Sequence, residues 1–461
     1  MRWCFYPSKE LGKIRELSFM VQRKAFFPSF PNFSAEKHTI FCLLEKKGVS
    51  SHRILEYILA KSKSKTQSKK AKKGGSLLGS IFKWAFRSVM AMLTACLCLI
   101  LIASAFSDYI NPTIWVLPSF LGIAFGIFLA IAVIWFFVLL LTRRWHSLLV
   151  LVVTFAIISI PAWRYCPLHL GGGPKPLMQN DKGEEIKVDS LRVFSFNTNI
   201  MGQTHLSRIK EHIPVIDVIR RSGADIVCLQ EYGFTLKQGG HTEQELRGEL
   251  KDLYPYYDFM PNDQRKALGI AIFSKHPIRK AIRIDKRKKG YFSAMYYQLD
   301  VRGRTMGLVN MHLRSNMIDP KDRILYDEMI EKFEPDSLDR IRTGMMRALA
   351  QAYRLRSAES GMVRQVLLDH HPKDMPLLIC GDMNDTPISY CYQSLRQIGL
   401  YDTWQETGIG PGITYRANHF WFRIDHLLHS KHFRALQSRV RKDVKNSDHY
   451  PVEAIYQLLP E

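Results

Sequence analysis

The sequence has no Cys-x-x-Cys pair and no regular cysteine spacing, although it contains eight cysteines in 461 residues. This absence argues against a zinc-finger type of site and against a disulfide framework. Residues 1–87 contain no aspartate, and their nineteen Lys and Arg against five Glu supply +14 of the net charge of +23. Because the positive charge is concentrated in this stretch, it does not indicate a nucleic-acid surface on the rest of the chain.

Acidic residues are also absent from three long apolar runs at residues 88–106, 115–141 and 147–163. Runs of this length approach or exceed the roughly 20 residues that cross the apolar core of a bilayer. We therefore predict three transmembrane helices within residues 88–165, preceded by a basic, disordered N-terminal segment over residues 1–87. Since the runs contain no acidic residue and no clear polar pathway, they are typical of an anchor rather than of a transporter or channel subunit.

The basic residues around these runs predict an orientation. Lys83 and Arg87 precede the first run, Arg143 and Arg144 separate the second from the third, and the loop at residues 107–113 has no Lys or Arg. The positive-inside rule then places the N-terminus and the Arg143 loop in the cytoplasm. Three spans leave everything after the third run in the periplasm, as expected for a multi-pass protein of the inner (cytoplasmic) membrane.

A polar stretch at residues 166–189, which includes Gly171–Pro176, reads as a linker. After it, strand-like runs alternate with helical patterns at 205–222 and 337–370, so we predict an α/β domain over residues 190–461. The expected strands lie at residues 191–196, 225–229, 268–274, 292–300, 305–313, 376–380, 422–428 and 450–457.

Six of these runs end in, or directly adjoin, polar groups suited to phosphate and metal chemistry. In one of them, the apolar run Leu377–Cys380 leads through Gly381 into Asp382 and Asn384. One such group by itself is most simply a turn former. Six in one domain are hard to attribute to turns. The groups are Asn197 with Asn199, Glu231, His312, Asp382 with Asn384, Asp425 with His426, and Asp448 with His449.

The motifs around these residues occur in a characteristic order over residues 190–458. They are Phe196-Asn197, Leu229-Gln230-Glu231, Asn310-Met-His312-Leu313, Gly381-Asp382-Met-Asn384, Arg423-Ile-Asp425 and Ser447-Asp448-His449. Together they resemble the endonuclease/exonuclease/phosphatase superfamily, whose members have the DNase I-like fold. With its three apolar runs, the chain is similar to membrane-anchored members from Bacteroidetes-type bacteria. The resemblance implies a four-layer α/β/β/α sandwich and Mg²⁺- or Mn²⁺-dependent hydrolysis of phosphoester bonds.

The resemblance also implies a role for each residue. Glu231 would be the main metal ligand, joined by Asn197 and Asp448, with Asn199 as an extra candidate. A divalent cation held this way would neutralise charge on the phosphoryl group. His449 would contact the phosphate or activate water, while Asp425 fixes its tautomer.

The remaining matched residues would act on water and on the scissile phosphate. Asp382 and Asn384 would orient the attacking water, and His312 would bind or protonate the phosphate. The residue after Asp425 is His426, where many relatives have an aromatic residue, and a packing role is expected for it. The sequence does not identify a carboxylate partner for His312.

Three substrate classes stay open: nucleic acid, a phospholipid headgroup and a small phosphate ester. The His312-Leu313 match favours DNase I-like and sphingomyelinase-like relatives over abasic-site repair enzymes. The basic pair Arg265–Lys266 and the basic run Lys286–Lys289 would contact a phosphate backbone or simply be solvated. The alternative function is a non-catalytic binding module tethered to the membrane. Such a protein is expected to lack one of the key polar residues, and none is missing.

The predicted topology can be tested with alkaline-phosphatase fusions. A fusion after Glu461 should be active because it lies in the periplasm, and a fusion after Arg144 should be inactive because that loop is cytoplasmic. The opposite activity pattern would overturn the orientation.

Overall fold

A computed structural model describes residues 51–169, 177–179, 185–187, 190–202, 212–235, 241–262, 266–284, 292–316, 335–417 and 421–460. The chain divides into two compact units, Met1–Met90 and Ala91–Glu461. Helix α3 (Ser51–Ala105) contains residues 51–87 of the segment predicted to be disordered. Lysine is a good helix former and no proline interrupts this stretch, which accounts for the helix. Residues 1–50 lie outside the described residues.

Five shorter helices follow α3 and, with residues 91–105, form what we call the helical segment (residues 91–169). Among the described residues, only Gly79–Tyr109 is long and apolar enough to cross a membrane as one helix. Two bent pairs, with bends of 58° and 66°, also qualify if each pair counts as one span. The described residues thus hold one candidate span, or up to three, and the three-span topology stays a prediction. The helices are η2 (Ser107–Tyr109), α4 (Leu117–Ile123), α5 (Phe125–Leu141), α6 (Trp145–Ile157) and α7 (Ser159–Tyr165).

Proline explains the sharper of the two bends. Pro161 has no N–H to donate to the carbonyl of Ile157, so the helix breaks at Ile158 between α6 and α7. Near the other bend, Gly122 permits a close approach, because a Cβ there would lie 2.4 Å from Ser107 Oγ and 2.5 Å from the backbone oxygen of Ile388. The helical segment therefore packs backbone against backbone on the α/β domain at this point.

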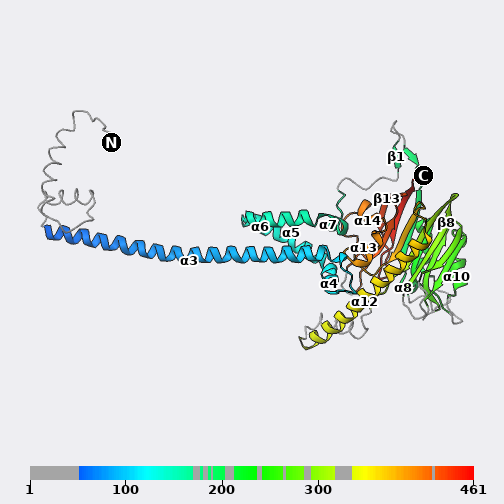
Figure 1. Ribbon diagram of the computed structural model, residues 1–461, viewed down its shortest axis with the longest axis horizontal. Coiled ribbons are helices and arrows are strands. Elements are labelled where there is room, and N and C mark those ends of the chain that lie inside the picture. Colours follow the sequence, from blue (N-terminus) through cyan, green and yellow to red (C-terminus); the bar gives the residue numbers. More distant parts are fainter. Residues whose placement is uncertain are drawn as a thin grey trace. The chain divides into compact units, whose positions relative to one another are not determined.

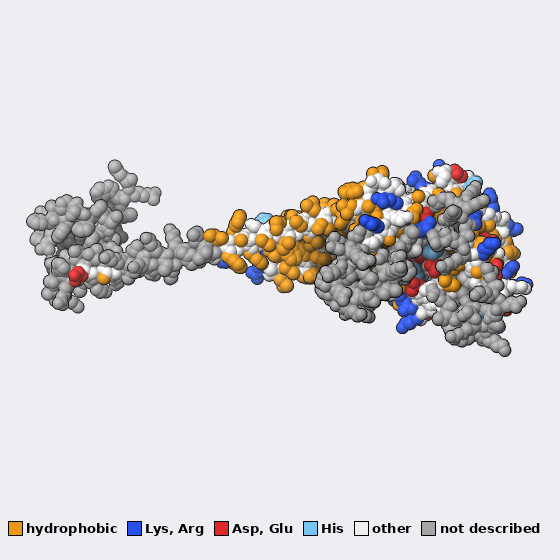
Figure 2. Space-filling view, turned by 90° about the horizontal axis from the view of Figure 1, so that it is seen from below, with side chains coloured by type: hydrophobic (Ala, Val, Ile, Leu, Met, Phe, Trp, Pro, Cys, Tyr) orange, Lys and Arg blue, Asp and Glu red, His pale blue; other side chains and the backbone are white. Residues whose placement is uncertain are grey.

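The helical segment exposes large apolar side chains, and orange side chains gather over it in Figure 2. Ile134 and Leu141, for example, are 65% and 82% exposed. A continuous apolar surface of this kind needs a cover other than water.

The α/β domain contains two six-stranded mixed sheets (Figure 1). The first sheet has the order β13-β14-β3-β4-β6-β5 and the second β11-β12-β10-β9-β8-β7. The first contains β3 (Ser190–Asn197), β4 (Ile226–Gly233), β5 (Tyr256–Pro261), β6 (Leu268–Ser274), β13 (Phe433–Val440) and β14 (Val452–Leu458). The second contains β7 (Ile278–Arg283), β8 (Ser293–Val301), β9 (Arg304–His312), β10 (Leu377–Asp382), β11 (Tyr401–Asp402) and β12 (Asp425–His429). A separate two-stranded sheet, β1 (Leu177–Gln179) with β2 (Glu185–Lys187), lies within the predicted linker.

Alternating residues of the strands build three apolar layers. In β3, Leu191 and Val193 belong to the core between the sheets, whereas Phe194 and Phe196 face the outer side. Helix α9 (Pro214–Ser222) packs on that outer side. Helices α12 (Pro335–His370) and α13 (Tyr390–Arg396) pack on the outer side of the second sheet. The predicted four-layer α/β/β/α sandwich is therefore confirmed.

Three further short helices belong to the α/β domain. They are α8 (Asn199–Gly202), α10 (Glu243–Gly248) and α14 (Thr403–Thr407). The predicted helix at 205–222 begins at Pro214 where it is described, and residues 203–211 lie outside the described residues. The start of the predicted linker is packed, because the Gly410 amide donates to the Pro167 carbonyl at 2.8 Å.

Strand pairing gathers the predicted strand-end residues at one edge. β3 and β4 are parallel, and Asn197 lies opposite Gln230. β9 and β10 are also parallel, and Asp382 lies opposite His312. On its other side Asp382 lies opposite Asp425, the first residue of antiparallel β12. This register is the reason that residues far apart in sequence form one site.

Gly381 is the position where this pairing tolerates no side chain. Its φ is +137°, and a Cβ would lie 1.9 Å from the backbone oxygen of Met311 on β9. We expect Gly381→Ala to lower the thermal-unfolding midpoint of the full chain by about 5–10 °C, because β10 must move away from β9. Gly361→Ala is the control: this exposed glycine in α12 has no atom within 4 Å of its Cβ position. That change should be neutral or stabilising, and equal loss in both variants would contradict the explanation.

Candidate active site

Glu231 occupies a strained position at the end of β4. Its φ is +47°, in the left-handed region that glutamate rarely adopts. The strand pairing shifts register between Leu229 and Tyr232, which marks a β-bulge. The Thr198 hydroxyl donates to the Glu231 carbonyl at 2.8 Å and holds the bulge. The bulge redirects the side chain of Glu231, and strain of this kind concentrates at functional sites.

Asn197 links the first sheet to the second. Its side-chain amide donates to Asp382 Oδ2 at 3.0 Å and to Glu231 Oε1 at 3.3 Å. Its side-chain oxygen accepts from the Asn199 backbone amide at 3.1 Å. Two carboxylates from different sheets therefore share one buried amide group.

Asp382 is held by the chain that follows it. The Asn384 backbone amide donates to Asp382 Oδ1 at 2.7 Å, and the Asn384 side chain donates to Asp382 Oδ2 at 3.2 Å. The same Asn384 side chain donates to the carbonyl of Leu313 at 3.0 Å. Asn384 has a φ of +52°, a conformation that asparagine tolerates well. The Asp382 carboxylate is thereby fixed in one orientation.

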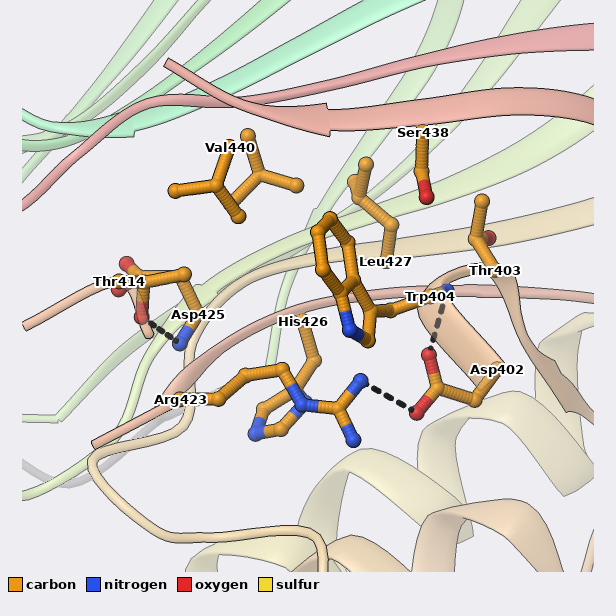
Figure 3. A pocket seen from close by; sticks show the side chains of 11 residues that line it. Asp402, Thr403, Trp404, Thr414, Arg423, Asp425, His426, Leu427, Ser438 and Val440 are labelled. Carbon is orange, nitrogen blue, oxygen red and sulfur yellow. Dashed lines mark hydrogen bonds and ion pairs between the residues drawn. The ribbon is translucent and has the colours of Figure 1, made fainter. Parts of the chain in front are cut away.

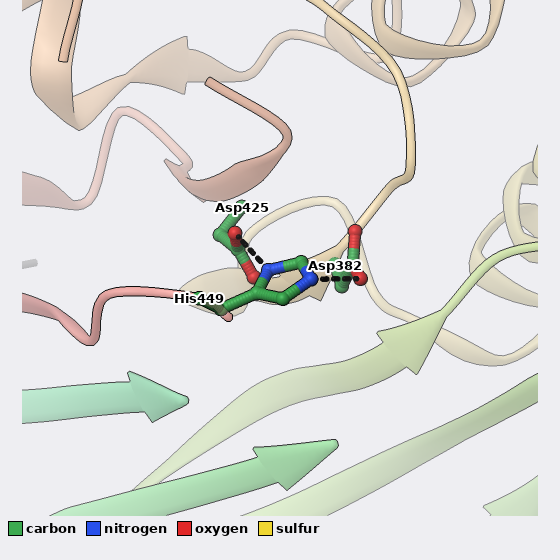
Figure 4. A group of neighbouring side chains, drawn as sticks. All are labelled: Asp382, Asp425 and His449. Atoms are coloured by element: carbon green, nitrogen blue, oxygen red, sulfur yellow. Dashed lines mark hydrogen bonds and ion pairs between the residues drawn. The ribbon is translucent and has the colours of Figure 1, made fainter. Parts of the chain in front are cut away.

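His449 lies between two carboxylates (Figure 4). Its Nδ1 is 2.8 Å from Asp425 Oδ2, and its Nε2 is 3.7 Å from Asp382 Oδ2. The three side chains are almost completely buried, and their ligand atoms lie within 4.8 Å of one another. The Tyr415 ring packs against the imidazole in a T-shaped arrangement, with the ring centroids 5.0 Å apart. The imidazole is therefore oriented by both hydrogen bonding and packing.

Burial and neighbouring charges together shift the pKa values of Asp382, Asp425 and His449. Burial raises the pKa of Asp382 to about 6, and the nearby charge of Asp425 adds to this shift. Burial alone would lower the pKa of His449, but the carboxylates of Asp425 and Asp382 raise it to about 10. Burial would raise the pKa of Asp425, yet the charge of His449 keeps it below its usual value. His449 and Asp425 thus behave as an ion pair.

His312 also faces two carboxylates. Its Nε2 lies 3.7 Å from Glu231 Oε1 and 3.6 Å from Asp382 Oδ2. This nitrogen is buried and has no hydrogen-bond partner among the described residues. The structure therefore identifies Glu231 and Asp382 as the carboxylates nearest to His312, which the sequence did not indicate. An unpartnered buried nitrogen between two acids leaves a position for a group that the site binds.

Asp448 reaches the site through its neighbour. The Ser447 hydroxyl is 2.8 Å from the Asn197 carbonyl and 3.3 Å from Asp448 Oδ1. Ser447 Oγ also accepts from the His449 backbone amide at 3.1 Å. This contact ties the last of the predicted metal ligands to the end of β3.

Two groups of side chains offer ligand atoms to a cation. One is Asp382, Asp425 and His449, and the other is Glu231 with Asn197 and Asp448. The Asp382, Asp425 and His449 side chains are 1%, 3% and 6% exposed, whereas that of Glu231 is 30% exposed. Mg²⁺ usually keeps several of its water molecules, and the exposure of Glu231 leaves it open to them. In addition, Nδ1 of His449 already contacts Asp425. The donor set around Glu231 therefore fits a hard cation better. Asn197 would offer its oxygen after a rotation of the amide, whose nitrogen faces the carboxylates here.

Several supporting contacts have no signal in the sequence. Backbone amides of Ile424 and Asp425 both donate to Thr414 Oγ1, each at 3.1 Å. His426 Nε2 lies 2.9 Å from the Asp385 carbonyl, and burial lowers the pKa of His426 to about 4, so this residue is a neutral packing group. Of the basic residues considered for phosphate binding, Arg265 and Lys286–Lys289 lie outside the described residues.

Similarity to known proteins shows the family of the chain. Residues 199–449, more than half of the chain, match the Endonuclease/Exonuclease/phosphatase family. The chain belongs to this family. The predicted resemblance is confirmed at that level, while a Bacteroidetes-type origin stays a prediction. Residues 87–164 separately match a Domain of unknown function (DUF8431).

Individual family members are distant from this chain. Sphingomyelin phosphodiesterase 2 from Homo sapiens is 25% identical over 221 residues, which are 47% of each protein. The chain thus spans about half the length of that curated relative. An endonuclease/exonuclease/phosphatase from Beutenbergia cavernae is 18% identical over 59% of this chain and 72% of its own, with a TM-score of 0.38. The catalytic domain of human Nocturnin is 17% identical over 58% of this chain and 93% of its own, with a TM-score of 0.41.

The position of the cation can be tested by binding alone. We expect Glu231→Gln to weaken Mg²⁺ or Mn²⁺ binding at least about tenfold in calorimetry, because the change removes a charged oxygen ligand. Glu249→Gln, the same change at an exposed position, should bind the metal normally. Normal binding by Glu231→Gln together with loss of binding by His449→Gln would place the ion in the buried cluster and contradict this assignment.

Proposed function

We propose that the protein is a metal-dependent phosphoesterase anchored in a membrane. The observation that carries the proposal is the pairing of His449 with Asp425, at 2.8 Å, beside a second carboxylate, Asp382, and the unpartnered Nε2 of His312. This combination provides a proton carrier, a group that orients it and an open position for phosphate. Membership of a hydrolytic family supports the same reaction type.

The residues can be assigned to steps of phosphoester hydrolysis. His449 would donate a hydrogen bond or proton to a phosphate oxygen, while Asp425 holds the ring in position. Asp382, oriented by Asn384, would accept a hydrogen bond from the attacking water. His312 would bind the phosphate from the other side of Asp382. A Mg²⁺ or Mn²⁺ ion held by Glu231, Asn197 and Asp448 would supply neutralisation of the phosphoryl charge.

Membrane anchoring is a separate part of the proposal. It is supported by the apolar helix Gly79–Tyr109 and by the exposed apolar side chains of the helical segment. The periplasmic position of the site follows only from the distribution of Lys and Arg. The relative named as a sphingomyelin phosphodiesterase makes a phospholipid headgroup one of the candidate substrates. Nucleic acid and small phosphate esters are the others.

A substrate panel on the full chain in detergent micelles tests the proposal. The panel comprises single- and double-stranded DNA, RNA, sphingomyelin, phosphatidylinositol phosphates and a generic phosphodiester, each with Mg²⁺, with Mn²⁺ and with EDTA. We expect metal-dependent release of product from at least one of them. Full activity in EDTA, or metal binding without hydrolysis of any substrate, would contradict the proposal, and the second result would favour a binding module.

His449 and Asp425 should act as one unit. On the substrate that the panel identifies, His449→Ala should lower kcat by about 10³-fold and Asp425→Asn by about 10–100-fold. The double variant should be little worse than His449→Ala, since Asp425 acts through the imidazole. Losses that simply multiply in the double variant would show that Asp425 does not orient His449.

A further inference from the structure

A buried arginine fastens the helical segment to the α/β domain. Arg164 of α7 contacts Asp108 of η2, with 2.5 Å between Nη2 and Oδ2, and both side chains are at most 3% exposed. The other terminal nitrogen of Arg164 donates to Gln393 of α13 at 2.7 Å. The same guanidinium thus joins both ends of the helical segment to the second sheet's outer helix layer.

The backbone of Arg164 makes a second contact, to a residue next to the site. Arg423 is buried and donates to the backbone carbonyl of Arg164 through Nη2. Its Nη1 donates to Asp402 Oδ2 at 3.2 Å (Figure 3). The same Asp402 oxygen accepts from the Tyr392 hydroxyl at 2.5 Å. The guanidinium of Arg423 therefore lies between a carboxylate of the α/β domain and a carbonyl of the helical segment. A buried cation is costly unless such partners remain in place.

Only Ile424 separates Arg423 from Asp425, and the backbone at this point is held on both sides. The amides of Ile424 and Asp425 donate to Thr414 Oγ1. The carbonyl of Ile424 accepts from Met383, the residue after Asp382, at 2.9 Å. An unbroken series of direct contacts therefore connects Arg164 with Asp425 and, through it, with His449.

The helical segment also touches helix α12 and the chain that follows Asp382. Asn111 Oδ1 accepts from the Ser357 hydroxyl of α12 at 2.8 Å. Gly122 of α4 lies against the backbone of Ile388, six residues after Asp382. Both carboxylates that flank His449 thus belong to stretches of chain that the helical segment contacts. A flexible tether would make neither contact.

We propose that Arg423 and Arg164 are positioning residues, through which the docked helical segment holds Asp425 in the orientation that His449 requires. The inference rests on the proposed phosphoesterase function for its activity measurement. If the segment were only an anchor, loss of these contacts would change stability and leave kcat intact. If the segment positions Asp425, loss of the contacts lowers kcat, because misplacement by about 1 Å can reduce a rate 10²-fold.

The test uses the full chain in detergent micelles with a substrate that the wild-type protein hydrolyses. Arg423→Met should lower kcat at least about tenfold with KM changed less than about twofold, and Arg423→Lys should recover part of the loss. Asp108→Asn, which leaves Arg423 intact, should lower kcat about threefold or more, and it covers the case in which Arg423→Met does not fold. Glu406→Gln is the matched control. This change weakens the ion pair, at 3.1 Å, between Glu406 and His429, which lies on β12 together with Asp425. It should leave kcat unchanged.

A double-variant cycle separates positioning from stability. In an Asp425→Asn background, Arg423→Met should cost little further activity, because Arg423 acts through Asp425. Losses that multiply fully in the double variant would overturn the inference. It would also be overturned if Arg423→Met and Asp108→Asn both kept the wild-type kcat and only lowered the unfolding midpoint. Absence of activity in the wild-type chain would instead overturn the proposed function, so the two failures are distinguishable.

Discussion

A hydrogen bond between two buried side-chain amides fixes the two sheets against each other at the edge that forms the site. Gln230 of β4 donates to Asn310 of β9 at 2.8 Å, and neither residue is exposed. Asn310 in turn donates to the carbonyl of Ala271 on β6 at 2.9 Å. If the sheets slid by one residue, these amides would lose partners in an apolar layer, at a cost of about 1–3 kcal/mol each. The neighbouring residues Glu231 and His312 therefore meet at a constant distance although they come from different sheets.

The central strands were predictable from the sequence, and the strands that escaped prediction are those at the sheet edges. The expected runs at 191–196, 268–274 and 376–380 correspond to β3, β6 and β10. β5, β7, β11 and β13 were not predicted, and each is the outermost strand of its sheet. An edge strand has one partner and a partly wet surface, so it carries charge and loses the continuous apolar pattern of a central strand. The sequence Ile-Arg-Lys-Ala-Ile-Arg of β7 is an example.

The site was predictable to the extent that its residues end strands. Parallel pairing brings strand ends together, so a list of polar strand ends is close to a list of site residues. Asn197, Asp382 and Asp425 meet as expected. Thr414 could not be found in this way, because it accepts from backbone amides that every residue except proline possesses. The same limit applies to the helical segment, whose apolar runs were evident while its contacts to the α/β domain depend on single residues such as Arg164.

The contact between Arg423 and the backbone carbonyl of Arg164 has a consequence for how this protein can diverge. A carbonyl is present whatever side chain stands at position 164, so Arg423 can persist while that side chain is exchanged. Asp108 and Arg164 contact each other by their side chains and would have to be replaced together, as charge reversal or as an apolar pair. Covariation among homologues would therefore reveal the Asp108–Arg164 pair and remain silent about the neighbouring link to Arg423.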